Sequence, residues 1–447
     1  MGRESAPPDH ITPYDRFAWS DTDIEQLLAH GRNPRELIAY FGAAEYRDLV
    51  RLAQLGARTP TSDHAVRVFV VPGIMGSQLG LRRPPPLPND ILWLDPIDIG
   101  VGRLAALHVP TGAPIVPLGV VLYSYLRLKL HLRARGFAPL LYDYDWRLGV
   151  DELGPQLAAA IRADPAQRTM IVAHSMGGLV SRAALAQPGL RKVERVVLLG
   201  TPNSGSFAPL QALRGTYAVV RKIARLTTRQ SAEALADKIF NSFPSLYQML
   251  PVRTRSSEPD LFDAAQWPRR GPQPDAGLLR AARDIHGKLA PADERICAIV
   301  GVGQETVTAA RRHRDQFIYT VTRHGDGTVP ALSAALPGAQ MHYATVPHSE
   351  LTRHPIVAAA VTELLATGTT LRLKSEWQTS STAEAHVSDA QLRRMQADKV
   401  DWARLEANER RQFLQNLNEP PKLHLRVPKR TKQRTAVRRR QRKPSFR

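Results

Sequence analysis

The chain has 447 residues, of which 43% are apolar, and its formal net charge is +20. A composition this apolar can bury a core, which excludes a wholly disordered chain, and the length allows one large α/β domain with appendages or two to three ordinary domains. The single cysteine, Cys297, cannot form an internal disulfide, and we expect it to be a buried strand thiol rather than a nucleophile. No Cys/His cluster has the spacing of a structural zinc site, so we expect neither a structural metal nor a cofactor.

The positive charge is concentrated at the C-terminus. Residues 421–447 hold twelve Lys or Arg and no Asp or Glu, which leaves +8 for residues 1–420. We expect a disordered basic tail that is attracted to anionic membrane surfaces. Nucleic acid is not an expected partner, because Phe446 alone cannot provide a row of aromatic stacking platforms.

The sequence contains no recognisable targeting or membrane-spanning segment. Its first twenty residues lack the apolar core of a secretory signal, and no stretch reaches the roughly 18 apolar residues needed to cross a bilayer. We therefore expect a cytoplasmic protein, peripheral to a membrane at most, unless a signal-independent system exports it.

Residues 1–64 are predicted to form a helical N-terminal extension. Ser20 precedes a first turn that contains Asp23, and Gly31 is a stop signal. Asn33 and Glu36 then predict a second capping box, with Pro34 in the first turn.

Residues 65–368 are predicted to form one catalytic domain. Short apolar runs, typical of strands buried on both faces, occur at residues 66–71, 139–142, 170–173, 196–199, 296–300, 317–321 and 341–346. Helical stretches at residues 153–163, 178–186 and 351–365 separate several of them. This alternation predicts an α/β fold with a mostly parallel central sheet and helices on both faces.

Two long insertions interrupt the alternation. We expect a lid at about residues 81–118, rich in proline and glycine around Trp93, and a cap at about residues 204–292. Such insertions usually lie over the carboxyl ends of the strands, where ligands bind. Residues 369–420 are predicted to be a polar helical segment, with a helix from Ser388, capped with the help of Gln391, to about Leu417.

The strongest signal for chemistry is a strand, a turn and a helix around Ser175. Ala173-His174-Ser175-Met176-Gly177 fits the nucleophile elbow of α/β-hydrolases, although Ala173 replaces the usual first glycine. A sharp turn brings the flanking backbone close, so residues 173 and 177 must be small. The alternative is a glycine-containing turn with a bystander serine.

A serine nucleophile needs a base and an acid that orients this base, in the chain order Ser, Asp or Glu, His. Asp326, between two glycines, follows the run 317–321, and His348 follows the run 341–346. We assign Asp326 as the acid and His348 as the base. The competing histidines are His174, His324 and His354.

The oxyanion hole needs a second N–H group from the loop after an early strand. Gly73 and Gly76 allow the loop after the run 66–71 to bend around a ligand oxygen. We assign the N–H groups of Ile74 and Met176 to the oxyanion hole, with Met75 as the next choice for the loop.

Seven segments in this order resemble the lecithin:cholesterol acyltransferase family over roughly residues 66–366. They are VPGIMGSQL (71–79), WLD (93–95), YDWRL (144–148), AHSMG (173–177), GTPNSGS (200–206), GDGTVP (325–330) and His348. The resemblance implies a triad of Ser175, Asp326 and His348 and a lipid ester substrate under a lid and cap. Trp93 and Met75 are candidate substrate or lid residues.

The sequence departs from this family in the lid. Members from secretory compartments carry a disulfide-tethered lid, whereas the stretch 81–91 has no cysteine. Asp145 and Arg147 are predicted to form a structural ion pair beneath the site.

Three functions stay open at this point. The first is a serine esterase or acyltransferase acting on lipid esters, either a phospholipase or a lipid O-acyltransferase. The second is an esterase, thioesterase or polyester depolymerase on the same fold. The third is a binding protein that acts through its basic tail.

Overall fold

The computed structural model describes residues 20–59, 65–110, 112, 114–227, 230–253, 258–378, 383–395, 398–417, 419–420 and 422–423. Its centre is a six-stranded sheet in the order β11-β8-β7-β6-β1-β5. All five strand pairs in it are parallel. The strands are β1 (Arg67–Val71), β5 (Ala138–Leu141), β6 (Thr169–His174), β7 (Val193–Leu199), β8 (Ile296–Gly301) and β11 (Gln340–Ala344).

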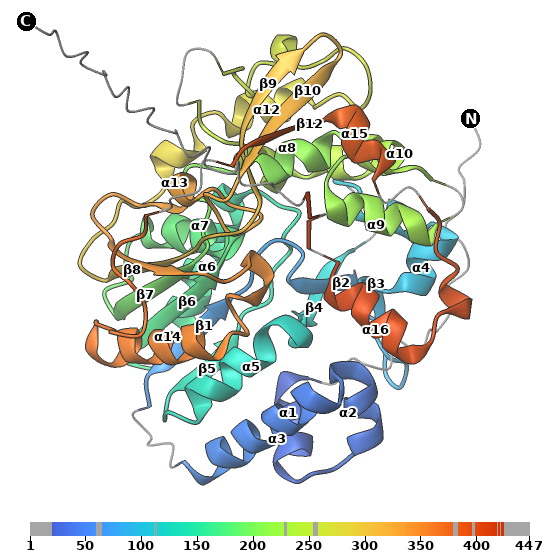
Figure 1. The fold of residues 1–447 in the computed structure, drawn as a ribbon. Coiled ribbons are helices and arrows are strands. Elements are labelled where there is room, and N and C mark those ends of the chain that lie inside the picture. The colour runs from blue at the N-terminus through green and yellow to red at the C-terminus, as the bar shows by residue number, and fades with distance from the viewer. Residues whose placement is uncertain are drawn as a thin grey trace, which may run out of the picture.

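Helices cover both faces of this sheet (Figure 1). Phe69 and Val71 of β1 share one apolar cluster with α6 (Val150–Ala163) and α7 (Met176–Leu185). Val68 and Val70 share the other cluster with α5 (Leu122–Arg133) and α14 (Pro355–Thr367). Because successive side chains of a strand point to opposite faces, the apolar residues 68–71 contact both helical layers. The predicted α/β-hydrolase fold is confirmed.

One predicted strand of the central sheet lies elsewhere. The run 317–321 forms β10 (Gln316–Thr322), which pairs antiparallel with β9 (Thr306–His313) and β12 (Ala385–Ser388) in a separate sheet. The short turn after β9 forces the antiparallel pairing, since a parallel crossover needs a dozen or more residues. Only alternate residues of β10 are buried, as expected for a sheet with one buried face.

Three N-terminal helices pack on α5 and form one apolar cluster with it. They are α1 (Asp21–Ala29), α2 (Pro34–Phe41) and α3 (Ala43–Arg58). The capping box of Ser20 with Asp23 is present. The second predicted box is absent, because Asn33 adopts a left-handed conformation with φ of 52° and its side chain makes no capping hydrogen bond.

The insertion at residues 81–118 is structured. It contains β3 (Asp90–Trp93) and the start of β4 (Val116–Val120), which both pair antiparallel with β2 (Ser77–Leu81) in a small sheet. It also contains α4 (Pro96–Val101) and a 3₁₀ helix (Arg103–Leu107). Buried charges hold it together. Arg103 donates to Asp90 at 2.5 and 2.8 Å and to Asp98 at 2.6 Å, and Arg83 lies 3.2 Å from Asp90.

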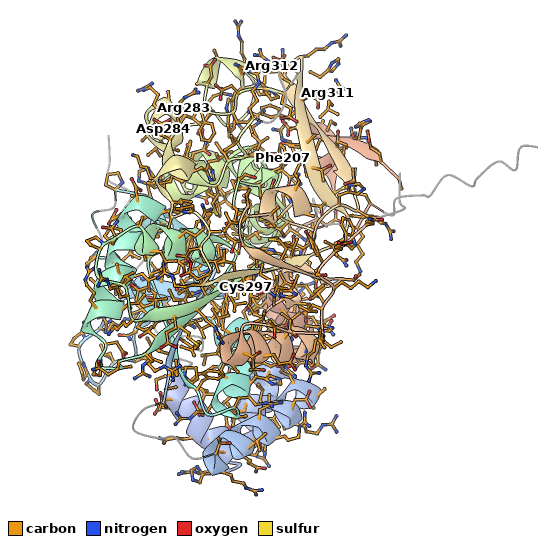
Figure 2. All side chains as sticks on the ribbon, turned by 90° about the vertical axis from the view of Figure 1, so that its left-hand side faces the viewer. Phe207, Arg283, Asp284, Cys297, Arg311 and Arg312 are labelled. Carbon is orange, nitrogen blue, oxygen red and sulfur yellow. The ribbon has the colours of Figure 1, made fainter. Side chains whose placement is uncertain are left out.

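The insertion at residues 204–292 forms a helical layer next to the hairpin of β9 and β10 (Figure 1). Its helices are α8 (Phe207–Leu213), α9 (Ala218–Leu226), α10 (Ala232–Lys238), α11 (Pro244–Gln248) and α12 (Ala276–Ala282), with 3₁₀ turns at Phe240–Ser242, Ala264–Gln266 and Ile285–Lys288. Figure 2 shows Arg311 and Arg312 of β9 at the end of the molecule opposite the N-terminal helices. Cys297 lies near the middle, where it is buried in β8 as predicted.

The predicted helix from Ser388 to Leu417 is two helices. The box of Ser388 with Gln391 is present, but α15 (Asp389–Arg394) ends after six residues, and α16 (Ala407–Gln415) follows a 3₁₀ turn (Trp402–Arg404). Between them, Met395 and Val400 contact α9: Arg221 donates to the Met395 carbonyl at 2.9 Å, and the Val400 N–H donates to the Arg225 carbonyl at 2.9 Å. These contacts with α9 replace helical hydrogen bonds. The expected basic tail lies almost wholly outside the described residues, which end at Leu423.

Within the described part of the chain, no helix is both long and apolar enough to cross a membrane.

We predict that Arg103→Met destabilises the protein, because it leaves the buried carboxylates of Asp90 and Asp98 without their shared guanidinium. Removing one partner from a buried ion pair costs about 3–5 kcal/mol, and urea unfolding should show a loss of that order. Arg168→Met is the matched control, since the Arg168–Glu194 pair is exposed to solvent and therefore contributes little to stability. Equal losses in the two variants would contradict a stabilising role of the buried cluster.

Candidate functional site

Ser175 lies on a sharp turn between β6 and α7. Its backbone has φ of 54° and ψ of −126°, a strained conformation for a residue other than glycine. A Cβ atom at Gly177 would lie 2.5 Å from the Val71 carbonyl oxygen, so this position admits only glycine without a shift of the backbone. The strand, turn and helix of a nucleophile elbow are therefore present, and the steric reason is contact with the loop after β1.

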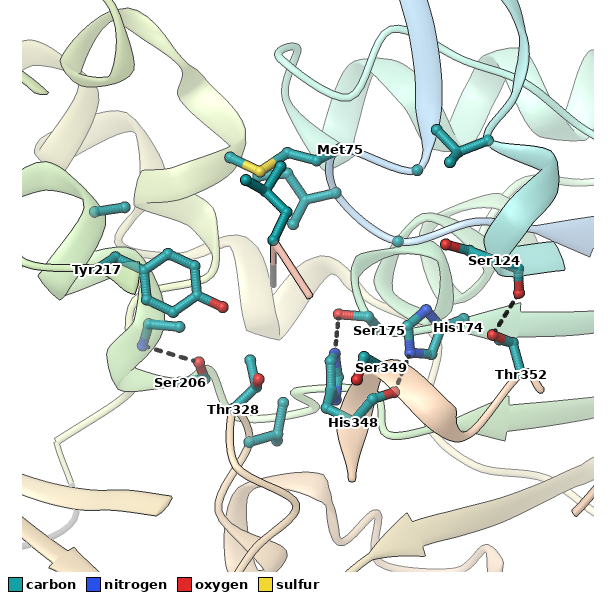
Figure 3. Close-up of a pocket in the computed structure, with 18 of the residues that line it drawn as sticks. Met75, Ser124, His174, Ser175, Ser206, Tyr217, Thr328, His348, Ser349 and Thr352 are labelled. Atoms are coloured by element: carbon teal, nitrogen blue, oxygen red, sulfur yellow. Dashed lines mark hydrogen bonds between the residues drawn. The ribbon is translucent and has the colours of Figure 1, made fainter. Parts of the chain in front are cut away.

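The structure brings Ser175, His348 and Asp326 together in one hydrogen-bonded chain, of which Figure 3 shows the bond between Ser175 and His348. Ser175 Oγ lies 3.0 Å from His348 Nε2, and His348 Nδ1 lies 2.7 Å from Asp326 Oδ2. Because a carboxylate only accepts, Nδ1 carries the proton that it donates to Asp326, and Nε2 is free to accept the serine hydroxyl. All three side chains are largely buried.

Asp326 is held from two sides. Its other oxygen, Oδ1, accepts the N–H groups of Thr328 at 2.9 Å and Val329 at 2.7 Å. Its backbone carbonyl accepts the N–H of His348 at 2.8 Å, which joins the loop after β10 to the loop after β11. The carboxylate is thus positioned although β10 lies outside the central sheet.

The loop of residues 72–77, which contains the two candidate oxyanion residues after β1, is held by four aromatic side chains. Tyr144 donates to the Pro72 carbonyl at 2.6 Å, Trp93 to the Met75 carbonyl at 3.1 Å, and Trp146 to the Ser77 carbonyl at 3.0 Å. The fourth, Tyr125, accepts the Gly73 N–H at 2.8 Å. Trp93, predicted from sequence as a substrate or lid residue, therefore also supports the backbone of this loop.

Ile74, from the loop after β1, lines the same cavity as Ser175, and Met176 follows Ser175 as the first residue of α7. Within the described residues, no acceptor takes the backbone N–H of either. Met75, the second choice for the loop, has a left-handed backbone with φ of 63°, and its side chain lines the cavity in front of Ser175. N–H groups without an acceptor near a serine hydroxyl can stabilise an oxyanion.

His174 is the competing histidine that the structure places nearest the serine. Its Nδ1 lies 3.0 Å from the Tyr125 hydroxyl and its Nε2 lies 3.1 Å from the His348 carbonyl oxygen. Since the Gly73 N–H donates to Tyr125, the tyrosine hydroxyl donates to Nδ1, and Nε2 donates to His348. Burial holds the pKa of His174 well below its usual value, so the ring is neutral and acts as a bridge between loops.

The other two histidines take no part in this arrangement. His324 packs edge-on against Trp377, and His354 precedes the first turn of α14. Asp145 and Arg147 form the predicted ion pair at 2.6 Å, and Arg147 also donates to the Leu107 carbonyl, which joins this pair to the 81–118 insertion. Within the described residues, no group of three or more His, Cys, Asp or Glu could hold a metal ion.

A cavity of about 130 Å³ lies in front of Ser175. Trp93 and Met75 line it, together with residues of the 204–292 insertion such as Tyr217 and Met249. Leu414, Gln415 and Leu417 also line it, and they come from α16 and its end. No local sequence motif marks these C-terminal residues or Tyr125, because their side chains reach the site only through tertiary contacts.

Comparison with known protein families found one match. Residues 157–254 match the family described as the PGAP1-like alpha/beta domain. No curated protein matches the chain.

Several solved structures match parts of the chain at low identity. The propeptide form of Bacillus licheniformis lipase BlEst2 is 15% identical with a TM-score of 0.39, and the match covers 73% of this chain and 54% of that one. A chain of the Tle4–Tli4 complex is 15% identical with a TM-score of 0.41, covering 71% and 100%. The metagenomic carboxyl esterase MGS0156 is 15% identical with a TM-score of 0.32, covering 65% and 68%.

We predict that Tyr125→Phe destabilises the protein by about 1–3 kcal/mol, because the buried Gly73 N–H and His174 Nδ1 both lose their partner. Chemical denaturation measures the loss. Tyr142→Phe is the control, since the Tyr142 side chain is only partly buried. A stability unchanged from the parent would contradict the proposed bridge through Tyr125.

Proposed function

We propose that this α/β-hydrolase is a serine esterase or O-acyltransferase that acts on lipid esters through an acyl-enzyme intermediate. The observation that carries the proposal is the hydrogen-bonded chain from Ser175 through His348 to Asp326. The order of these residues in the sequence and their geometry both fit nucleophilic catalysis by serine.

In the proposed reaction, His348 Nε2 takes the proton of Ser175 as Oγ attacks the ester carbonyl. The N–H groups of Ile74 and Met176 hold the oxyanion of the tetrahedral intermediate. His348 then gives the proton to the leaving alcohol, and Asp326 stabilises the imidazolium throughout. Every step uses side chains and backbone of this chain alone.

Either water or an acceptor alcohol resolves the acyl-enzyme. The resemblance to the lecithin:cholesterol acyltransferase family favours a lipid acyl donor and includes phospholipase and transacylase chemistry. The proposal is supported by residues in the segments that resemble this family: Trp93, Tyr144 and Trp146 donate hydrogen bonds to the backbone on both sides of Ile74. Product analysis with and without an acceptor alcohol separates hydrolysis from transfer.

Shorter esters, thioesters and polyesters are the second candidate substrates. They would undergo the same acyl transfer at Ser175, and the chain-length dependence of turnover separates them from lipid esters. If the protein instead acted only by binding through its basic tail, it would turn over none of these esters.

We predict that a fluorophosphonate labels Ser175 stoichiometrically, because His348 activates the hydroxyl. Ser175→Ala should abolish labelling and lower ester turnover at least about a thousandfold. Ser349→Ala is the matched control, since Ser349 lines the same cavity outside the hydrogen-bonded chain. Undiminished labelling of the Ser175 variant would refute the assignment.

We also propose that the basic tail binds anionic membranes. A chain that ends at residue 423 lacks eleven of the twelve cationic residues of segment 421–447. We predict that the full chain binds phosphatidylserine vesicles in a salt-sensitive manner and that the truncated chain does not, because each cation near the surface contributes about 1 kcal/mol. Sedimentation with vesicles measures this, and turnover of a water-soluble ester should be equal in the two chains. Salt-insensitive binding would contradict the electrostatic mechanism.

A further inference from the structure

A second and larger cavity adjoins the one in front of Ser175. Its volume is about 660 Å³, against about 130 Å³ for the first. Five residues line both cavities: Leu94, Val121, Tyr123, Leu414 and Gln415. The two spaces therefore meet along a shared wall.

Segments at the two ends of the chain build the outer side of this second cavity. Ala39 and Tyr40 come from α2, and Trp402 and Ala407 come from the C-terminal segment. The inner side comes from α4 and the end of α9. In Figure 1, α16 lies between the small sheet of β2 to β4 and the N-terminal helices.

Several contacts hold α16 in this position. Gln415 Nε2 donates to the Phe41 carbonyl at the end of α2 at 3.5 Å. Lys222 of α9 donates to the carbonyls of Asn416 and Glu419, just after α16. Arg225 of the same helix lies over the Phe413 ring, 5.9 Å from its centroid.

The lining of the second cavity suits an apolar chain. Its inner side carries aliphatic residues, among them Ile97, Val101 and Leu226. The two arginines at the cavity, Arg410 and Arg411, donate to uncharged groups: to the Trp402 and Ala403 carbonyls and to Asn408. No carboxylate of the described residues lines this cavity.

Size decides which space holds a long substrate. Pockets for small organic ligands measure about 300–1,000 Å³, so the cavity at Ser175 alone is too small for a lipid and the second cavity is of the right size. We propose that the second cavity binds the long acyl chain of a lipid ester whose carbonyl lies at Ser175. This inference rests on the proposed function and assigns a substrate-binding role to α2 and α16, which lie outside the α/β-hydrolase resemblance.

Two substitutions, each on a different helix, test the proposal by filling the second cavity. Ala407→Trp on α16 and Val101→Trp on α4 place a large side chain at the lining, and both positions are exposed to solvent, which spares the core. Gln412→Trp is the matched control on α16, because Gln412 is exposed and does not line the cavity. The substrates are the p-nitrophenyl esters of acetate, butyrate, octanoate and palmitate.

We expect both filling variants to lower kcat/KM for the palmitate ester by about tenfold or more, the effect of losing about two buried methylenes, and to leave the acetate ester unchanged. The control should behave as the parent protein. Losses that are equal at all chain lengths, or absent, would overturn the assignment of the cavity.

A binding measurement separates this proposal from the catalytic one. Palmitate is titrated calorimetrically into the Ser175→Ala protein, with and without Ala407→Trp. Weaker binding in the filled variant supports the chain site even if no ester is turned over, and equal binding refutes it even if Ser175 proves to be the nucleophile.

Discussion

The arrangement around Ser175 depends on the close approach of three backbone loops. A Cβ atom at Gly73 would lie 2.9 Å from the Ser175 Cβ, and one at Gly177 would lie 2.5 Å from the Val71 carbonyl oxygen. Gly200, after β7, has a left-handed backbone, and a Cβ there would lie 3.0 Å from both Asp326 Oδ2 and His348 Nδ1. Side chains at these positions would push the serine, its base and the oxyanion loop apart, which explains three glycines in three separate motifs.

Hydrogen bonds then fix what the glycines allow. Tyr125, bonded to Gly73 and His174, connects the loop after β1 to the elbow, and His174 continues the connection to the His348 backbone. The indole N–H groups of Trp93 and Trp146 and the hydroxyl of Tyr144 donate hydrogen bonds to backbone carbonyls of this bent loop. The Gly73 N–H and the carbonyls of Pro72, Met75 and Ser77 are thereby paired, which favours a rigid loop inside an apolar core.

The appended segments extend the site rather than stand apart from it. Arg103, paired with two buried aspartates, holds the 81–118 insertion together by charge where the resembling family uses a disulfide in its lid. The C-terminal helix α16 reaches the cavity in front of Ser175 and also lines the larger cavity beside it. Parts of the chain far from Ser175 in the sequence therefore shape the space in front of it.

Local patterns in the sequence determined the parallel strands, the helices between them and the elbow, because apolar periodicity, caps and tight turns act within a few residues. The sequence order of Ser175, Asp326 and His348 was enough to propose a triad, and their hydrogen bonds exist only in the folded chain. Only tertiary structure decided that β10 leaves the central sheet, that the Asn33 side chain does not cap α2, and that α15 and α16 are two separate helices. The distant partner of β10 is β12, and that of Met395 and Val400 is α9; hydrogen bonds to these partners outweigh the local preference.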